Sequence, residues 1–317
     1  MNCERLDLEC IDIFQYKNDI KKLDINIPVW IDPVSIECYK NKEIIRINLD
    51  NIPLAYYVVP FYTKNGKLWA EREYRYFAYL SPFFIRECPN KKKKEAVYMI
   101  YKYIFDKYDY MYMPLHPDFT EISPIQGLGA FMESRHTHIL TDVLNLNNLD
   151  SKLRNNIRSA SKKITVTIDF DPNKFNFDIA IHGSDGEKKN RKEHAMNLLK
   201  IHKAIIFTGY YEGEPIIGNM VTFDNEWVYG LHAWQVDKVP RGSGPFIIYS
   251  ISKWAFETKK LKYFDFEGSI MLSIDDYFCN FNAKQIIYPY IHYGKNKNEM
   301  LELIDISHDV EGRLYNE

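Results

Sequence analysis

A glycine-containing turn that introduces a long apolar segment constrains the fold of this chain more than any other sequence feature. The turn spans residues 241–245, and apolar residues follow it at helical spacing through residues 246–256. This spacing predicts a helix, with Ser243 as its N-cap and Pro245 in its first turn, where a missing N–H costs nothing. A helix start with free N–H groups favours an anion. The residues expected to bind that anion are Arg241, Gly242, Ser243 and Gly244.

A short apolar segment with two acidic residues follows the predicted helix, at residues 262–269. We predict that it is a strand, and because side chains alternate along a strand, Asp265 and Glu267 then share one face. Two neighbouring carboxylates have raised pKa values, which suits them to take a proton from an amine. Asp265 and Glu267 are therefore the predicted catalytic residues. The alternative is that they are solvated edge residues or ion-pair partners of nearby lysines.

Segments on both sides of this strand carry a resemblance to a known family. The run 265–269 is followed by Ile274, Tyr277, Phe278, Phe281, Asn282, Ala283 and Tyr288. This pattern resembles the C-terminal signature of the FemAB-like branch of the GNAT acyltransferase superfamily. Residues 135–140 and 153–162 resemble the junction between the two halves of such proteins.

The resemblance implies an α/β fold of two GNAT-like domains, each with a mixed, mostly antiparallel sheet flanked by helices. We expect an N-terminal domain at residues 1–142 and a C-terminal domain, which carries the donor and acceptor sites, at residues 143–317. The implied activity is N-acyl transfer. The expected donor is acetyl-CoA or another acyl-CoA, used as a co-substrate. The expected acceptor is a small-molecule or lipid-linked amine, such as a cell-wall or surface-glycan precursor.

Five further residues are expected to bind substrate: Arg135, Arg158, Tyr229, His232 and Trp234. In the family resemblance, the basic helix at the junction lies near the substrate groove. Arg135 and Arg158 are therefore expected to bind a phosphate or carboxylate through bidentate contacts. The other three residues lie at the end of the last predicted strand before the glycine turn, and His232 is also a candidate proton carrier. A solvated basic face and a structural histidine are the alternatives.

Two histidines, His136 and His138, stand two positions apart in a predicted strand and so lie on one face, as a pair of metal ligands would. Structural metal sites use four ligands, and no third ligand stands near them in the sequence. We therefore predict no metal site.

Periodicity predicts the remaining elements. Three strands at 204–211, 215–223 and 226–234 form a meander. In the first half we expect a helix within 11–25, strands at 43–49 and 55–62, a hairpin turn at Asn65-Gly66 with a return strand from Leu68 to Leu80, and a helix at 95–107.

Composition restricts the partners and the compartment. The chain of 317 residues has a net charge of −2, which gives no general field for nucleic acid, and we expect no DNA partner. Its five cysteines form no C-x-x-C pair, which favours reduced thiols in the cytoplasm. No apolar run reaches about 18 residues, so we expect no transmembrane segment. The oligomeric state stays open.

Two alternatives to acetyl transfer remain. The first is aminoacyl-tRNA-dependent transfer to a peptidoglycan precursor. It is disfavoured because residues 187–203 leave room for one ordinary helix, whereas family members that use aminoacyl-tRNA insert a long helical arm. The second is a non-catalytic module of the same fold that binds a glycan or a nucleotide.

Overall fold

The computed structural model describes residues 5–23, 25–71, 77–181, 183–267, 272–295 and Asn298. The chain forms two compact units. Unit 1 takes Met1–Ile25, Trp30–Arg135 and Ile287–Glu317, and unit 2 takes Asn26–Val29 and His136–Ile286. Strands β7 (Phe131–Leu140) and β13 (Lys284–Gly294) each begin in one unit and end in the other. In the described part of the chain, no helix is both long and apolar enough to cross a lipid bilayer.

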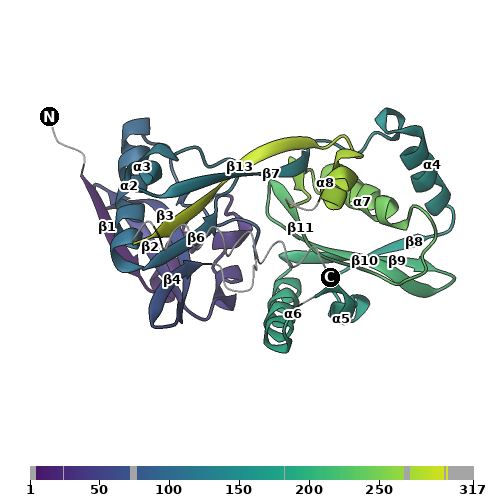
Figure 1. The fold of residues 1–317 in the computed structure, drawn as a ribbon, viewed down its shortest axis with the longest axis horizontal. Helices are drawn as coiled ribbons and strands as arrows, with labels where there is room; N and C mark the ends of the chain where they lie inside the picture. Colours follow the sequence, from purple (N-terminus) through teal and green to yellow (C-terminus); the bar gives the residue numbers. More distant parts are fainter. Residues whose placement is uncertain are drawn as a thin grey trace. The chain divides into compact units, whose positions relative to one another are not determined.

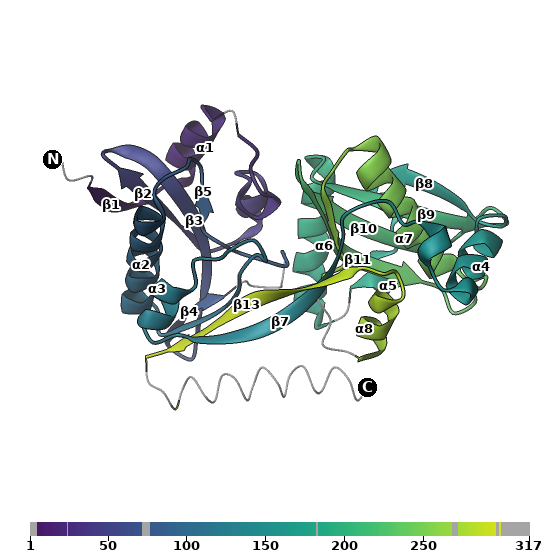
Figure 2. The ribbon, with the colours of Figure 1, turned by 90° about the horizontal axis from the view of Figure 1, so that it is seen from above.

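Unit 1 contains a mixed sheet with the strand order β1-β2-β3-β4-β6-β13, and β5 pairs with β3. Its strands, besides β7 and β13, are β1 (Leu6–Ile11), β2 (Lys42–Leu49), β3 (Ile52–Lys64), β4 (Lys67–Glu71), β5 (Phe83–Phe84) and β6 (Tyr110–Pro114). Its α-helices are α1 (Ile13–Lys21), α2 (Asn90–Lys107) and α3 (Ser123–Gly127). Strands β4 and β6 pair in parallel. Helices α2 and α3 lie side by side, with α2 next to β1 (Figure 2).

The predicted elements of unit 1 are confirmed except at one strand end and at the start of α2, which begins at Asn90 rather than at residue 95. Asn65 and Gly66 have left-handed φ angles of 52° and 73° and connect β3 to β4 in the expected hairpin. The predicted return strand to Leu80 is wrong at its end, because β4 stops at Glu71 and residues 77–80 are not in a strand. The Leu80 N–H instead donates to the Pro114 carbonyl at 2.9 Å. Residues 72–76 of that prediction lie outside the described residues.

Unit 2 contains the part of the sheet with the strand order β7-β12-β11-β10-β9-β8, in which parallel and antiparallel pairs both occur. Its strands, besides β7 and β13, are β8 (Thr165–Asp169), β9 (Ala204–Tyr211), β10 (Glu214–Phe223), β11 (Trp227–Gln235) and β12 (Tyr263–Asp265). Its α-helices are α4 (Ser151–Ala160), α5 (Phe177–Ala180), α6 (Asp185–Lys200), α7 (Ser243–Lys253) and α8 (Leu272–Cys279). A π-helix at Trp254–Thr258 continues α7. Figure 1 shows α4 and α7 on one face of this sheet, and α5 and α6 on the other.

Short 3-10 helices connect these elements. They are η1 (Val29–Ile31), η2 (Ser35–Cys38), η4 (Leu146–Asn148) and η5 (Pro172–Lys174).

Helix α7 supplies the core of unit 2, as its apolar face predicts. Ile247 and Ile251 are fully buried, and they share one apolar cluster with Phe207 of β9, Val228 of β11 and Phe264 of β12. Burying a side chain of this size contributes about 2 kcal/mol relative to exposure. The predicted meander β9-β10-β11 is confirmed within one residue at each end.

The start of α7 differs from the prediction. The N-cap is Gly242, with a φ of 90°, and Ser243 is the first helical residue, so the predicted N-cap is wrong. A Cβ atom on Gly242 would lie 2.3 Å from the backbone oxygen of Asn156 in α4. Glycine is therefore required at this position for two reasons. The backbone is left-handed there, and α4 approaches too closely to leave room for a Cβ atom.

We expect Gly242→Ala to destabilise the protein by about 3 kcal/mol or more, because it adds both backbone strain and a clash with α4. Gly213→Ala is the matched control, since Gly213 has a φ of 88° and a Cβ atom added to it would meet no neighbouring atom within 4 Å. The control should cost about 1 kcal/mol. Urea unfolding measures both values. Equal losses would contradict the close packing of α4 on α7.

Candidate active site

Two neighbouring strands of unit 2 separate and leave a fork in the sheet. Strands β11 and β12 pair in parallel up to Tyr229, which lies opposite Asp265. There β12 ends, whereas β11 continues to Gln235. The second half of β11 therefore has no pairing with β12.

A β-bulge lies in β11 just beyond the fork. Gly230 is opposite Val221 of β10, whereas His232 is opposite Met220, so Leu231 is an extra residue without a partner in the β10 register. A bulge bends a strand and leaves backbone groups of the extra residue outside the ladder. The Leu231 backbone is therefore available to a ligand.

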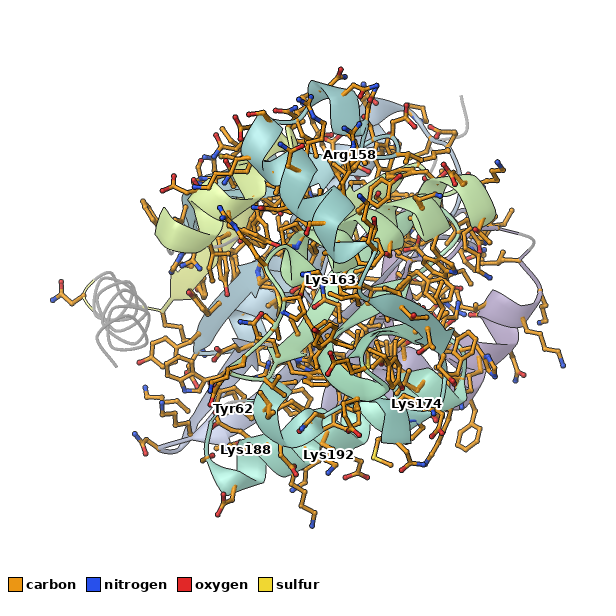
Figure 3. All side chains as sticks on the ribbon, turned by 90° about the vertical axis from the view of Figure 1, so that its right-hand side faces the viewer. Tyr62, Arg158, Lys163, Lys174, Lys188 and Lys192 are labelled. Atoms are coloured by element: carbon orange, nitrogen blue, oxygen red, sulfur yellow. The ribbon has the colours of Figure 1, made fainter. Side chains whose placement is uncertain are left out.

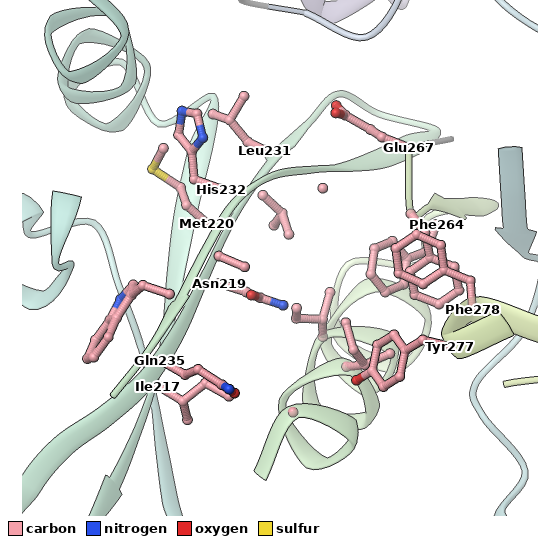
Figure 4. Close-up of a pocket in the computed structure, with 18 of the residues that line it drawn as sticks. Ile217, Asn219, Met220, Leu231, His232, Gln235, Phe264, Glu267, Tyr277 and Phe278 are labelled. Carbon is pink, nitrogen blue, oxygen red and sulfur yellow. The ribbon is translucent and has the colours of Figure 1, made fainter. Parts of the chain in front are cut away.

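An apolar cavity of about 570 Å³ opens at this fork (Figure 4). Its walls come from α5, β10, β11, α7, β12, α8 and the residues that follow β12. The polar side chains that line it are Asn219, His232, Gln235, Glu267 and Tyr277. Its volume is that of a small-molecule site, in which a few polar groups orient a ligand between apolar walls.

The two predicted catalytic carboxylates have different surroundings. Asp265 is completely buried, and its carboxylate accepts hydrogen bonds from the Thr137 hydroxyl and, at 2.7 Å, from the Glu267 N–H. Glu267 follows the end of β12 with a left-handed φ of 58° and lines the cavity (Figure 4). The prediction that both share the face of one strand is therefore wrong, because a turn held by Asp265 intervenes. The remaining residues of the predicted strand, Gly268 and Ser269, lie outside the described residues.

Two of the three aromatic residues predicted in β11 reach the cavity. His232 and Trp234 line it, whereas Tyr229 is buried and stacks in parallel on Trp227. Burial, followed by the charges of Arg191 and His194, lowers the pKa of His232 to about 3. The imidazole is therefore neutral at neutral pH and is a weaker base than a proton carrier for an amine requires.

The glycine turn contributes less to the cavity than its sequence predicts. Of the four residues of this turn that were predicted to bind an anion, Gly244 lines the cavity, whereas Arg241 is exposed and lies outside it. The Ser243 N–H donates to the Pro240 carbonyl, and the next residue that carries an N–H after Gly244, Phe246, donates to the Gly242 carbonyl. Within Ser243–Phe246, Gly244 therefore keeps an N–H that no described backbone carbonyl accepts.

Gly244 also makes room for a side chain of α8. A Cβ atom there would lie 3.2 Å from the Tyr277 hydroxyl oxygen, which is tighter than ordinary contact. Burial raises the pKa of Tyr277. Tyr277 is therefore a neutral hydroxyl beside the start of α7.

Arg135 belongs to a hydrogen-bonded network in unit 1. Its guanidinium donates to Glu133 at 2.8 Å and to the Tyr112 hydroxyl at 3.0 Å, and it lies 4.3 Å from the ring centre of Tyr290. Burial alone would raise the pKa of Glu133, but hydrogen bonds from His292 and Arg135 lower it to about 2. The Arg135 guanidinium therefore pairs with the Glu133 carboxylate, and we do not assign it to the binding of a substrate anion.

Arg158, the other predicted anion ligand, is exposed on α4 (Figure 3). It is absent from the residues that line the cavity. The structure therefore brings together His232, Trp234, Gly244 and Glu267 among the predicted site residues.

Sequence reasoning missed a second cluster in unit 2. No third ligand stands near the two histidines of β7 in the sequence, but in the fold α8 brings Asp275 and Cys279 next to His138. The signal in the sequence is the i, i+4 spacing of Asp275 and Cys279, which places both on one face of a helix.

The fold defined by these two units is the tandem GNAT fold. The sequence matches no known family profile and no curated protein. A crystal structure of FemX superposes with a TM-score of 0.63 at 13% identity, covering 94% of this chain and 99% of that one.

Two further solved structures have the same fold. The C-terminal domain of a protein described as a lysylphosphatidylglycerol synthetase from Agrobacterium fabrum has a TM-score of 0.57 at 11% identity, covering 93% of this chain and 95% of that one. A tandem GNAT protein from the clavulanic acid biosynthesis pathway has a TM-score of 0.55 at 6% identity, covering 92% and 99%. These likenesses confirm the predicted α/β fold, which this chain shares with FemX and with tandem GNAT proteins.

The buried His232 predicts a loss of stability in acid. Because its pKa is lower in the folded state than in the unfolded chain, the unfolded chain takes up the proton first. The contribution of the neutral His232 to the free energy of unfolding is therefore fully present above about pH 6.5. It is lost as the pH falls toward 3, by up to about 1.4 kcal/mol per pH unit. We expect His232→Asn to reduce this slope in urea unfolding between about pH 6 and 4. The control is His202→Asn, at an exposed left-handed position, and equal slopes in both variants would contradict the prediction.

Proposed function

We propose that this protein is an acyltransferase that moves an acyl group to an amine acceptor in the cavity of unit 2. The observation that carries the proposal is the fork between β11 and β12, where Glu267 faces an apolar cavity. The fold shared with FemX and with tandem GNAT proteins supports acyl or aminoacyl transfer as the reaction class. The proposed acceptor is a small-molecule or lipid-linked amine that the protein binds in the cytoplasm.

Residues at the fork have separate roles in the proposed reaction. The acceptor nitrogen attacks the acyl carbonyl, and Glu267 takes the proton that the nitrogen releases. The bond from the carbonyl to the sulfur or oxygen of the donor then breaks, and the leaving group takes up a proton. The Leu231 N–H, outside the β10 ladder, is the proposed donor to the developing oxyanion. Placing both reactants between rigid walls supplies the remaining rate enhancement.

The N-terminal end of α7 favours one acyl donor over the other. A pyrophosphate group is bound at a helix start by several free N–H groups, but here the Ser243 N–H donates to the Pro240 carbonyl, Pro245 has no N–H, and α4 packs against Gly242. This crowding favours an aminoacyl ester donor over acetyl-CoA. Helix α6 is an ordinary helix of 16 residues, so a tRNA donor would be bound without a long helical arm.

Binding experiments distinguish the two donors. We expect wild-type protein to bind a stable aminoacyl-tRNA analogue and to show no calorimetric signal with acetyl-CoA up to about 1 mM. Ala233→Phe narrows the cavity, because Ala233 is one of its lining residues, and should weaken donor binding at least about tenfold. Thr167→Phe, at an exposed position of β8, is the matched control. If the wild type binds acetyl-CoA with micromolar affinity and Ala233→Phe does not, acetyl-CoA is the preferred donor. If the wild type binds neither acetyl-CoA nor the aminoacyl-tRNA analogue, the proposed function is contradicted.

The role of Glu267 is tested by turnover with the donor that binds. Glu267→Gln should lower kcat by about 10²- to 10⁴-fold and leave donor binding unchanged, because it removes the proposed base and keeps the shape. Glu212→Gln is the control, since Glu212 shares the left-handed φ, 54°, in the β9-β10 turn. A wild type that binds the donor without turnover would identify the non-catalytic module instead. Unchanged kcat in Glu267→Gln would remove Glu267 from the mechanism.

A further inference from the structure

Three side chains with metal-binding atoms, His138, Asp275 and Cys279, meet between β7 and α8 of unit 2, and His136 lies beside Asp275. His136 and His138 lie two positions apart in β7 and therefore on one face of the strand. Asp275 and Cys279 lie four positions apart in α8 and therefore on one face of the helix. Each element contributes a pair, although the two pairs are far apart in the sequence.

The distances in this cluster are those of ligands around one small cation. The His138 Nε2 atom lies 3.4 Å from the Cys279 Sγ atom and 3.5 Å from an Asp275 carboxylate oxygen. The same oxygen lies 3.2 Å from His136 Nε2. Around tetrahedral zinc, bonds of about 2.0 to 2.3 Å place neighbouring ligand atoms about 3.2 to 3.8 Å apart. These three separations fall in this range, and the ligand atoms of His138, Asp275 and Cys279 all lie within 4.8 Å of one another.

The arrangement does not suit a nucleophile relay. In a relay, the thiol faces one nitrogen of the imidazole and the carboxylate orients the other. Here the thiol and the carboxylate both approach Nε2 of His138, whose Nδ1 atom is buried without a hydrogen-bond partner. Donor atoms that converge on one point, rather than in a line, are typical of a shared cation.

We propose that His138, Asp275 and Cys279 form a zinc site, with His136 as the fourth ligand. Imidazole nitrogen, thiolate sulfur and one carboxylate oxygen suit zinc, whereas magnesium and calcium prefer oxygen alone. His138 is completely buried and fixes the inner side of the site, whereas His136 is 41% exposed and closes the outer side. Four protein ligands make the site structural.

The zinc site connects α8 to β7. Residues Tyr277 and Phe278 of the same helix line the cavity at the fork. Bound metal would therefore hold one wall of the cavity in place. The metal site itself does not depend on the proposed function.

Metal binding is measured on the full-length protein after treatment with a chelator. We expect one zinc ion per chain on reconstitution. With cobalt, we expect a thiolate charge-transfer band and the intense visible bands of tetrahedral coordination. Cys279→Ser should abolish the charge-transfer band and weaken zinc binding at least about 100-fold. Asp275→Asn should weaken zinc binding but keep the thiolate band.

Cys10→Ser, at an exposed cysteine of unit 1, is the matched control and should bind both metals as the wild type does. Addition of zinc to the stripped protein should raise the melting temperature of the wild type and not that of Cys279→Ser. The proposal is overturned if the wild type binds no more zinc than Cys279→Ser, or if its cobalt spectrum has no thiolate band.

Discussion

The buried carboxylate of Asp265 is the interaction on which the candidate site depends. A carboxylate removed from water costs several kcal/mol unless hydrogen bonds replace its hydration. Thr137 of β7 and the N–H of Glu267 supply such bonds. They hold β12 against β7, and they turn the chain into a left-handed conformation one residue after Phe266. The early end of β12, the fork beside β11 and the position of Glu267 at the cavity all follow from this one group.

Close approaches of backbone determine how the helices surround that fork. Gly242 brings α4 against the first turn of α7, and Gly244 leaves space for the Tyr277 hydroxyl of α8. Glycines before a helix have two common uses, phosphate binding and tight packing, and a sequence alone does not separate them. In this chain Gly242 serves packing. The Ser243 N–H at this helix start donates to the Pro240 carbonyl, so it is already used within the turn.

Local patterns in the sequence predict most of the fold and only part of the site. The meander β9-β10-β11, the hairpin at Asn65-Gly66 and the apolar face of α7 depend on periodicity and turn chemistry within a few residues, and all three are confirmed. The turn after Asp265 depends on Thr137, 128 positions earlier, so strand alternation misplaced Glu267 relative to Asp265. Likewise, the side chains that face His138 come from α8, up to 141 positions later. No local pattern contains such contacts.

The two strands that pass from one unit to the other affect the order in which the chain folds. Strand β13 pairs with β6, and Tyr290 lies opposite Pro114. The sheet of unit 1 therefore gains this strand only after the whole of unit 2 has been synthesised. Contacts so distant in sequence close large loops and slow folding. Until β13 arrives, one edge of β6 presents open hydrogen-bonding groups, which is the form of a nascent chain most prone to pair with another and to need a chaperone.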